Sequence, residues 1–181
     1  MKRNTLVKQG FATKAIHGGY SENTFGALTA PIYQTSTFIF DSAEQGGRRF
    51  ALEENGYIYS RLGNPTSATV EEKLALLEGA EDAVVTASGM GAISSALWTA
   101  LKCGDHVLAS DTLYGCTFAL LMHGLTKFGI EVTLVDMSNL DAVRKALRKN
   151  TRVVYLETPA NPTLKLIDIK AVSTLAREAS N

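Results

Sequence analysis

The sequence has 181 residues, 45% of them hydrophobic, so the chain can bury one substantial core and has the size of about one domain. Eighteen Lys and Arg residues balance eighteen Asp and Glu residues, which argues against nucleic acid or an anionic membrane as the partner. We expect no secretory leader, no membrane-spanning segment and no disulfide framework, since the sequence shows no leader pattern, no long apolar run and only two distant cysteines. We therefore expect a cytoplasmic protein with a small-molecule partner.

The first 65 residues are rich in Gly, Ser, Thr and aromatic residues and show no sustained helical period. A structureless segment of this length is unusual inside a compact domain. Its large apolar side chains are too many for a solvated tail. They include Phe25, Tyr33, Phe38, Phe40, Tyr57 and Tyr59. We predict an arm that packs on another surface, such as that of a neighbouring subunit.

A regular pattern begins at Pro65, where Val70, Leu74 and Leu77 mark a helix that ends at Gly79. Strands and helices then alternate. Strands are predicted near 82–86, 106–110, 131–135 and 152–156, and helices near 91–101, 115–127, 139–148 and 168–178. This alternation predicts an α/β fold with a mainly parallel sheet, whose ligands bind beyond the carboxyl ends of the strands.

Three polar segments follow predicted strands: Ser88-Gly89-Met90, "SDTLYGCT" at 110–117 and "ETPANPT" at 157–163. Because the carboxyl ends of parallel strands share one edge of a sheet, we expect these segments to meet in one crevice. In the first segment, glycines allow close approach of the backbone to a ligand, and free N–H groups at a helix start attract an anion. A ligand that carries a phosphate is predicted, although glycines at such turns often serve geometry alone.

A dinucleotide site is the rival interpretation. Gly89-x-Gly91-x-x-Ser94 nearly matches the dinucleotide fingerprint, and Asp111 lies about twenty residues further on, where a ribose-binding acid is expected. The third position is Ser rather than Gly or Ala. A nicotinamide fold also gives no role to the aromatic arm or to "YSRLGNPT". The rival is weaker but stays open on the residues alone.

The segments "YIYSRLGNPT", "SGMGAI", "DTLYGCT" and "ETPANP", in this order and spacing, resemble the Cys/Met-metabolism family of pyridoxal-phosphate (PLP) enzymes. The resemblance covers essentially the whole chain. It implies the type I aminotransferase-like fold, PLP as cofactor, and a homotetramer built as a dimer of dimers. Residues 1–65 would be an arm that contributes to the neighbouring subunit, and residues 66–181 the first part of a truncated large PLP-binding domain.

The resemblance also assigns contacts to the cofactor phosphate. Gly89 and Met90 would offer backbone N–H groups to it, in a turn that Ser88 helps to shape. Tyr59 and Arg61 would reach the same phosphate from the neighbouring subunit, since an Arg can bond two phosphate oxygens at once. Without the flanking motif, Arg61 would be interpreted as a solvated surface charge.

Three further residues would contact or support the cofactor ring. Tyr114 would lie over the ring and donate a proton to the departing sulfur; a phenolate role would first require positive charge or hydrogen bonds that lower its pKa from ~10. Asn161 would bond the ring hydroxyl oxygen, and Glu157 would support the site. The plainer alternatives are a Tyr that caps the core and a capping Asn in a proline turn.

Cys116 bears on the substrate. Family members that act on cystathionine or acylated homoserine commonly carry Gly at this place, whereas Cys resembles the methionine-cleaving members. The implied reaction is α,γ-elimination of L-methionine to methanethiol, ammonia and 2-oxobutanoate. The alternatives are a cystathionine γ-lyase or γ-synthase and an O-acylhomoserine sulfhydrylase. A lone Cys is most often a small buried hydrophobe, and Cys103 is interpreted as structural.

The family's Schiff-base lysine lies in a Ser-x-Thr-Lys motif that these 181 residues do not contain. Lys127 does not replace it, because it falls late in a predicted helix before Gly129, where a cation normally serves the helix end. We expect an N-terminal part of a PLP-dependent lyase that is inactive alone. A non-catalytic assembly module is the alternative from another class. No metal site is predicted, since the three histidines lack metal-binding spacing.

Overall fold

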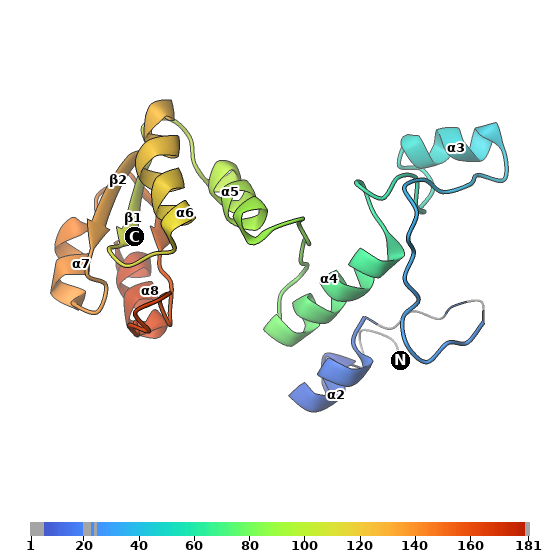
Figure 1. The fold of residues 1–181 in the computed structure, drawn as a ribbon, viewed down its shortest axis with the longest axis horizontal. Coiled ribbons are helices and arrows are strands. Elements are labelled where there is room, and N and C mark those ends of the chain that lie inside the picture. Colours follow the sequence, from blue (N-terminus) through green and yellow to red (C-terminus); the bar gives the residue numbers. More distant parts are fainter. Residues whose placement is uncertain (1–5, 20–22, 24, 180–181) are drawn as a thin grey trace. The chain divides into compact units, whose positions relative to one another are not determined.

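The computed structural model describes residues 6–19, 23 and 25–179, and the chain forms two compact units, Met1–Val85 and Thr86–Asn181 (Figure 1). Residues 1–5, 20–22 and 24 of the predicted arm lie outside the described residues. In the part of the chain that is described, no helix is long and apolar enough to cross a membrane.

The first unit contains two short helices where no helical period was expected, α2 (Phe11–His17) and α3 (Ala43–Phe50). In α3, Ser42 caps the first turn through its hydroxyl, which accepts from the Gln45 N–H at 3.2 Å. Acidic Glu44 at the start and two arginines at the end also favour the helix dipole. The sequence shows no sustained helical period here, and α3 forms through local capping while it buries only Gly46.

Helix α4 (Pro65–Glu78) starts and ends as predicted. Asn64 caps it by accepting from the Thr66 N–H at 2.8 Å, Pro65 occupies the first turn, and Gly79 ends it with a left-handed φ of 65°. Its buried residues are Ala75 and Leu76. Val70 and Leu74, two of the apolar residues from which the helix was predicted, are each 45% exposed.

Residues 82–86 do not form the predicted strand. A parallel strand needs a hydrogen-bonding neighbour, and in the described part of the chain none pairs with this segment. The Val85 N–H instead donates to the Glu71 carboxylate at 2.9 Å. The apolar run at 83–85 indicated a buried strand, but Val84 is 82% exposed.

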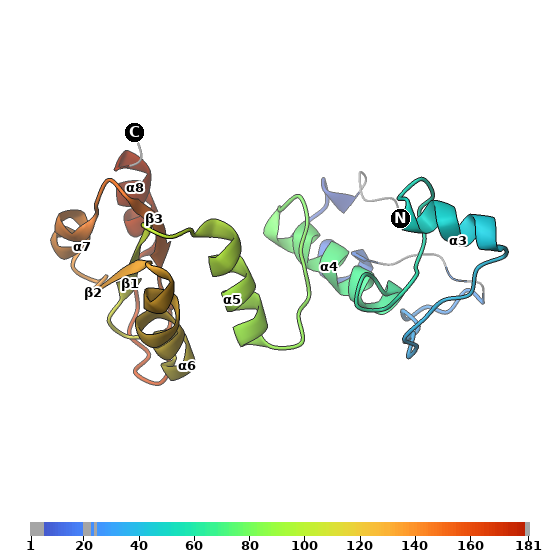
Figure 2. The ribbon, with the colours of Figure 1, turned by 90° about the horizontal axis from the view of Figure 1, so that it is seen from above.

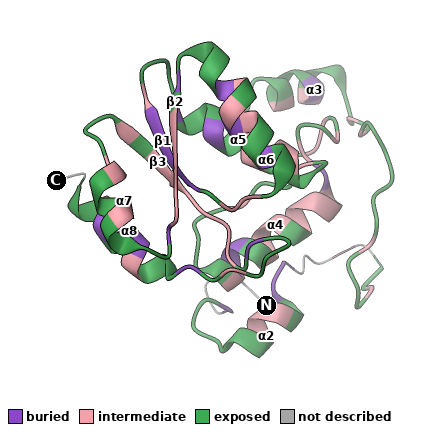
Figure 3. Cartoon of the chain, turned by 60° about the vertical axis from the view of Figure 1, so that its left-hand side comes forward, coloured by how far each residue is buried: buried purple, intermediate pink, exposed green. Residues whose placement is uncertain are grey.

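The second unit is built on a three-stranded parallel sheet in the order β2-β1-β3. The strands are β1 (His106–Ser110), β2 (Glu131–Val135) and β3 (Thr151–Tyr155), which confirms the predicted ranges 106–110 and 131–135 and moves the range 152–156 by one residue. His106 lies opposite both Glu131 and Thr151. All five residues of β1 are buried, as the central position requires (Figure 3).

Helices cover both faces of this sheet (Figure 2). One face packs against α5 (Gly89–Ala100), α6 (Gly115–Ala119), the π-helix η1 (Leu120–Gly124) and the 3-10 helix η2 (Leu125–Phe128). The other packs against α7 (Leu140–Ala146) and α8 (Ile169–Glu178). The buried residues of the first face are Leu97, Leu101, Val107, Ala109, Leu121, Leu125 and Ile130, and those of the second are Leu108, Met137, Val143, Ile167, Val172 and Leu175.

Three of these helices differ from the prediction. Helix α7 is shorter than the predicted range 139–148 at both ends. The expected helix 115–127 is three consecutive pieces of different pitch, α6, η1 and η2. Helix α5 begins at Gly89, two residues before the predicted start. Gly89 and Met90 therefore lie in the first turn of a helix rather than in the loop before it.

Candidate functional site

The start of α5 presents two backbone donors without a partner. Ser88 caps the helix, and its hydroxyl accepts from the Gly91 N–H at 3.0 Å. For the N–H groups of Gly89 and Met90, no acceptor lies within hydrogen-bonding reach among the described residues. A side chain added at Gly89 would meet no atom within 4 Å, so the space outside the helix is open. These donors at a helix N-terminus are suited to a phosphate.

The three polar segments contact one another, as predicted, although only the second and third follow strands that the structure describes. The Thr117 hydroxyl lies 3.7 Å from the Met90 sulfur, which joins the first segment to the second. Glu157 joins the second segment to the third. Its Oε2 accepts from the Tyr114 N–H and its Oε1 from the Asn161 N–H, both at 2.8 Å.

Tyr114 and Cys116 form a pair at the start of α6. Tyr114 is 44% exposed, and its hydroxyl oxygen lies 3.4 Å from the Cys116 sulfur. The neutral Cys116 S–H donates to the Tyr114 oxygen, whereas an ionised Cys116 sulfur could only accept a hydrogen bond from the phenol O–H, and its negative charge would disfavour a phenolate. Both effects of the ionised sulfur raise the pKa of Tyr114. The arrangement within this chain therefore keeps Tyr114 as a neutral phenol, a proton donor, rather than preparing a phenolate.

Replacing Cys116 by Gly is expected to lower the pKa of Tyr114 toward the ordinary phenol value, because the hydrogen bond and the charge that raise it are removed. Carbon NMR of the tyrosine rings against pH measures this shift, and a Tyr114→Phe variant assigns the signal. Cys103→Gly, at the other free cysteine, is the matched control and should leave the titration unchanged. The same titration curve with and without Cys116 would contradict this interpretation.

Asn161 lies on a loop that is closed by its own backbone. The Ala160 N–H donates to the Lys165 carbonyl at 3.0 Å, and the Leu164 N–H to the Ala160 carbonyl at 2.7 Å. The peptide bonds before Pro159 and Pro162 are both cis. Ala160 is fully buried, so the residue before Asn161 is anchored in the core.

Sequence reasoning missed Lys165. Its ammonium lies 2.7 Å from an oxygen of Asp136 and 3.5 Å from one of Asp111. A signal was available, because each of these acids directly follows a predicted strand, at the edge where the loop also lies. The lysine holds the pKa of Asp136 down at about 2, and the pairing raises the pKa of Lys165.

The same contacts weigh against the dinucleotide alternative. Asp111, the candidate ribose-binding acid, is paired with Lys165 and also accepts from the Thr112 hydroxyl at 3.0 Å. Ser94, at the third fingerprint position, donates to the Gly91 carbonyl at 3.2 Å. Both residues therefore have structural partners within this unit.

Tyr59 and Arg61 belong to the Met1–Val85 unit, in the turn that leads into α4. The Tyr59 carbonyl accepts from the N–H groups of Leu62 and Gly63 at 2.8 and 3.1 Å. The Arg61 guanidinium carbon lies 5.4 Å from the centre of the Tyr59 ring, a cation–π arrangement. Arg61 is exposed, so its donors are open to a ligand.

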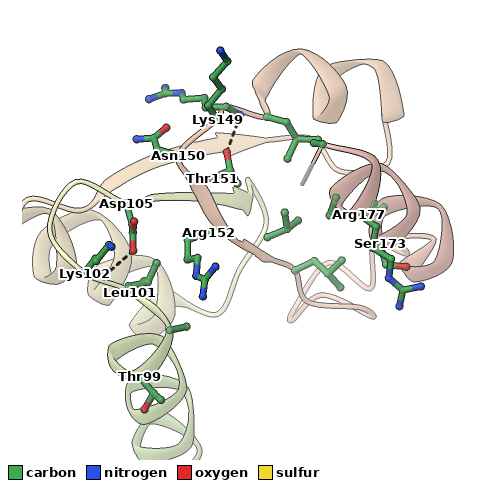
Figure 4. Close-up of a pocket in the computed structure, with 18 of the residues that line it drawn as sticks. Thr99, Leu101, Lys102, Asp105, Lys149, Asn150, Thr151, Arg152, Ser173 and Arg177 are labelled. Atoms are coloured by element: carbon green, nitrogen blue, oxygen red, sulfur yellow. Dashed lines mark hydrogen bonds between the residues drawn. The ribbon is translucent and has the colours of Figure 1, made fainter. Parts of the chain in front are cut away.

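A hollow of about 960 Å³ lies between the end of α5, strand β3 and α8 (Figure 4). Lys102, Arg152 and Arg177 are among its lining residues, and it contains none of the predicted site residues. Asp105 and Thr151 on its wall belong to the amino-terminal ends of the strands. The strand-end site is therefore a different place from this hollow.

The sequence predicted no metal site and a helix-end role for Lys127. Among the described side chains, no group of three His, Cys, Asp or Glu residues could hold a metal ion. Lys127 lies in the last turn of η2, two residues before Gly129 at φ 75°, which is the helix-end position expected for it.

Comparison with known proteins decides the family. The model of the Cys/Met metabolism PLP-dependent enzymes matches residues 12–181. The chain belongs to this family. The dinucleotide-binding alternative is therefore set aside. Among family members, an L-methionine gamma-lyase of Fusobacterium nucleatum subsp. polymorphum is 68% identical over 174 residues, which are 96% of this chain and 44% of that protein.

Two further relatives agree on the family. A probable cystathionine gamma-synthase of Herpetosiphon aurantiacus is 45% identical over 93% of this chain and 50% of its own length. The crystal structure of a putative O-acetylhomoserine (thiol)-lyase of Campylobacter jejuni, which contains a pyridoxyl-lysine monophosphate, matches with a TM-score of 0.84 and 37% identity. That match covers 95% of this chain and 42% of the other. The fold is thus the type I fold of PLP-dependent enzymes, and this chain spans less than half the length of the methionine lyase it matches.

Proposed function

We propose that the chain is the N-terminal part of a PLP-dependent carbon–sulfur lyase that converts L-methionine to methanethiol, ammonia and 2-oxobutanoate. The observation that carries the proposal is the pair of free N–H groups at Gly89 and Met90, beside the segment that holds Tyr114 and Cys116. The identity is also higher to the methionine lyase, at 68%, than to the cystathionine synthase, at 45%.

The described donors fit the cofactor. The N–H groups of Gly89 and Met90 would hold its phosphate, with Ser88 fixing the first turn of α5. Asn161 would bond the ring hydroxyl oxygen, and Glu157 fixes the backbone at both Tyr114 and Asn161. When bound, PLP supplies an electron sink for removal of the α-proton. The residues of this chain would hold and orient the cofactor and would move protons around it.

Tyr114 and Cys116 would act at the γ-sulfur of the substrate. Cys116 raises the pKa of Tyr114 and so favours the protonated phenol. That phenol would lie over the cofactor ring and deliver its proton to the sulfur as the thiol leaves. Cys116 would contact the substrate side chain and favour methionine over the bulkier amino acid cystathionine.

We propose further that the complete protein is a cytoplasmic homotetramer, a dimer of dimers. Residues 1–65 would be the arm toward the neighbouring subunit, from which Tyr59 and Arg61 reach the phosphate, and residues 66–181 the first part of the PLP-binding domain. Large exposed apolar side chains support an arm that becomes covered. They include Phe11, Phe25, Leu28, Ile32, Ile39 and Phe50.

A hybrid enzyme tests the substrate. Residues 1–181 replace the matching part of the Fusobacterium nucleatum lyase, and thiol release is measured with methionine and with cystathionine. We expect methionine turnover, and we expect Cys116→Gly to lower it more than it lowers PLP retention, whereas Cys103→Gly changes neither. A hybrid that cleaves cystathionine but not methionine would support the family's alternative activities instead.

The 181-residue chain alone should release no thiol from methionine in the presence of PLP, because it lacks the Ser-x-Thr-Lys motif. Thiol release by the isolated chain would show that another lysine takes this role. A chain that binds no PLP at all would favour the alternative of a non-catalytic assembly module.

A further inference from the structure

We propose that Lys165 is a positioning residue, which holds the loop 157–167 against the carboxyl ends of β1 and β2 and so fixes Asn161 toward the cofactor. This inference rests on the proposed function. The juxtaposition that carries it is one ammonium between two carboxylates from different strand ends, Asp111 after β1 and Asp136 after β2. The loop that bears Lys165 follows β3, so the residue ties all three strand ends together.

The acceptors of this ammonium are themselves held in place. The Asp136 oxygen that contacts Lys165 also accepts from the N–H and the hydroxyl of Ser138, at 2.9 and 2.6 Å. The Asp111 oxygen also accepts from the Thr112 hydroxyl at 3.0 Å. Carboxylates that are already held lose little further conformational entropy when the lysine pairs with them, so the ion pair can fix the position of Lys165.

The side chain of Lys165 acts on Asn161 through two short connections. The Lys165 carbonyl accepts from Ala160, the residue immediately before Asn161. The Asn161 N–H in turn donates to Glu157, which also accepts from Tyr114. Displacement of Lys165 would therefore reach both Asn161 and Tyr114, although Lys165 contacts neither side chain.

The ammonium is placed to hold the loop, because both of its carboxylate partners lie directly after strands. Its side chain is 29% exposed, and it pairs with an acid whose own side chain is 45% exposed. Partial burial protects such a pair from salt only in part, so high ionic strength should loosen it. A methionine at this position would keep an aliphatic stem of similar length but would lack the positive charge. An arginine would keep a long stem and the positive charge.

Amide hydrogen exchange of the whole chain, followed by NMR, tests this role. In Lys165→Met we expect exchange at the Ala160 and Asn161 N–H groups to be about fivefold faster, the size of effect that a partly exposed ion pair has on local opening. Lys165→Arg should restore the slow exchange. Lys170→Met, at an exposed lysine of α8, is the matched control and should not change it. Added salt should speed exchange in the wild type and not in Lys165→Met.

PLP affinity, measured on the same samples, separates this inference from the proposed function. We expect Lys165→Met to weaken PLP binding and Lys165→Arg to restore it, with intact overall folding. Unchanged exchange in Lys165→Met, or faster exchange with unchanged PLP affinity, overturns the positioning role. A wild-type chain that binds no PLP overturns the proposed function, and the exchange rates then still decide whether Lys165 holds the loop.

Discussion

Replacing Gly89 by Pro is expected to weaken binding of PLP by about tenfold or more, because it removes one of the two free N–H groups at the start of α5. The helix itself should persist. Proline is tolerated in the first helical position, and Ser88 before it has the extended backbone, φ −159° and ψ 156°, that a following proline requires.

Gly89→Ala is the matched control for this experiment. It adds a methyl group into open space and retains the N–H. Its PLP affinity should stay near that of the wild type, as titration calorimetry would show, while circular dichroism confirms that both variants are folded. Equal loss of affinity in the two variants would mean that the space beside Gly89, and not its N–H, matters.

Acidification below about pH 6.5 is expected to destabilise the second unit through His106. This residue is fully buried, with its ring nitrogens 2.8 and 2.9 Å from the hydroxyls of Thr151 and Thr133. Burial, and then the charge of Arg148, lower its pKa. The unfolded chain therefore binds a proton more readily than the folded one, so this contribution to stability is complete above the ordinary histidine pKa and is lost as the pH falls below it.

Urea unfolding at a series of pH values measures this effect. The free energy of unfolding should fall with a slope that approaches about 1.4 kcal/mol per pH unit. A His106→Gln variant should be less stable at neutral pH but should lose this slope, while His123→Gln, at an exposed histidine, should keep it. Asp136 titrates in a separate, lower window, between its ordinary pKa and about 2. A wild-type slope that survives in His106→Gln would contradict the role of this histidine.

The strands of the central sheet could be predicted because their signal is local. β1 and β2 are short apolar runs bounded by turn residues, and both were placed to the residue. The segment 82–86 has the same apolar character, yet it forms no strand, since a strand also depends on a neighbour that no local pattern reveals. Helices α2 and α3 were missed because they bury little: α2 has no buried residue and no capping side chain, and α3 is capped by Ser42 but buries only Gly46.

The approach of the polar segments to one another could be predicted in part. The segments of Tyr114 and Asn161, which follow β1 and β3, meet as the parallel order of strands requires, and the Met90 segment meets them through Thr117 although it follows no strand among the described residues. The two contacts of Glu157 and the pairing of Lys165 were not predictable, because each depends on how loops from different strands approach one another. The rise in the pKa of Tyr114 also follows from a tertiary detail, the orientation of the neighbouring Cys116 thiol.

Amide NMR spectra of the chain with PLP and with pyridoxal, which lacks the phosphate, would test the central claim most directly. If the start of α5 holds the cofactor phosphate, the Gly89 and Met90 signals shift strongly with PLP and little with pyridoxal at the same concentration. Unmoved Gly89 and Met90 signals, or equal shifts with both compounds, would contradict a phosphate site at this helix.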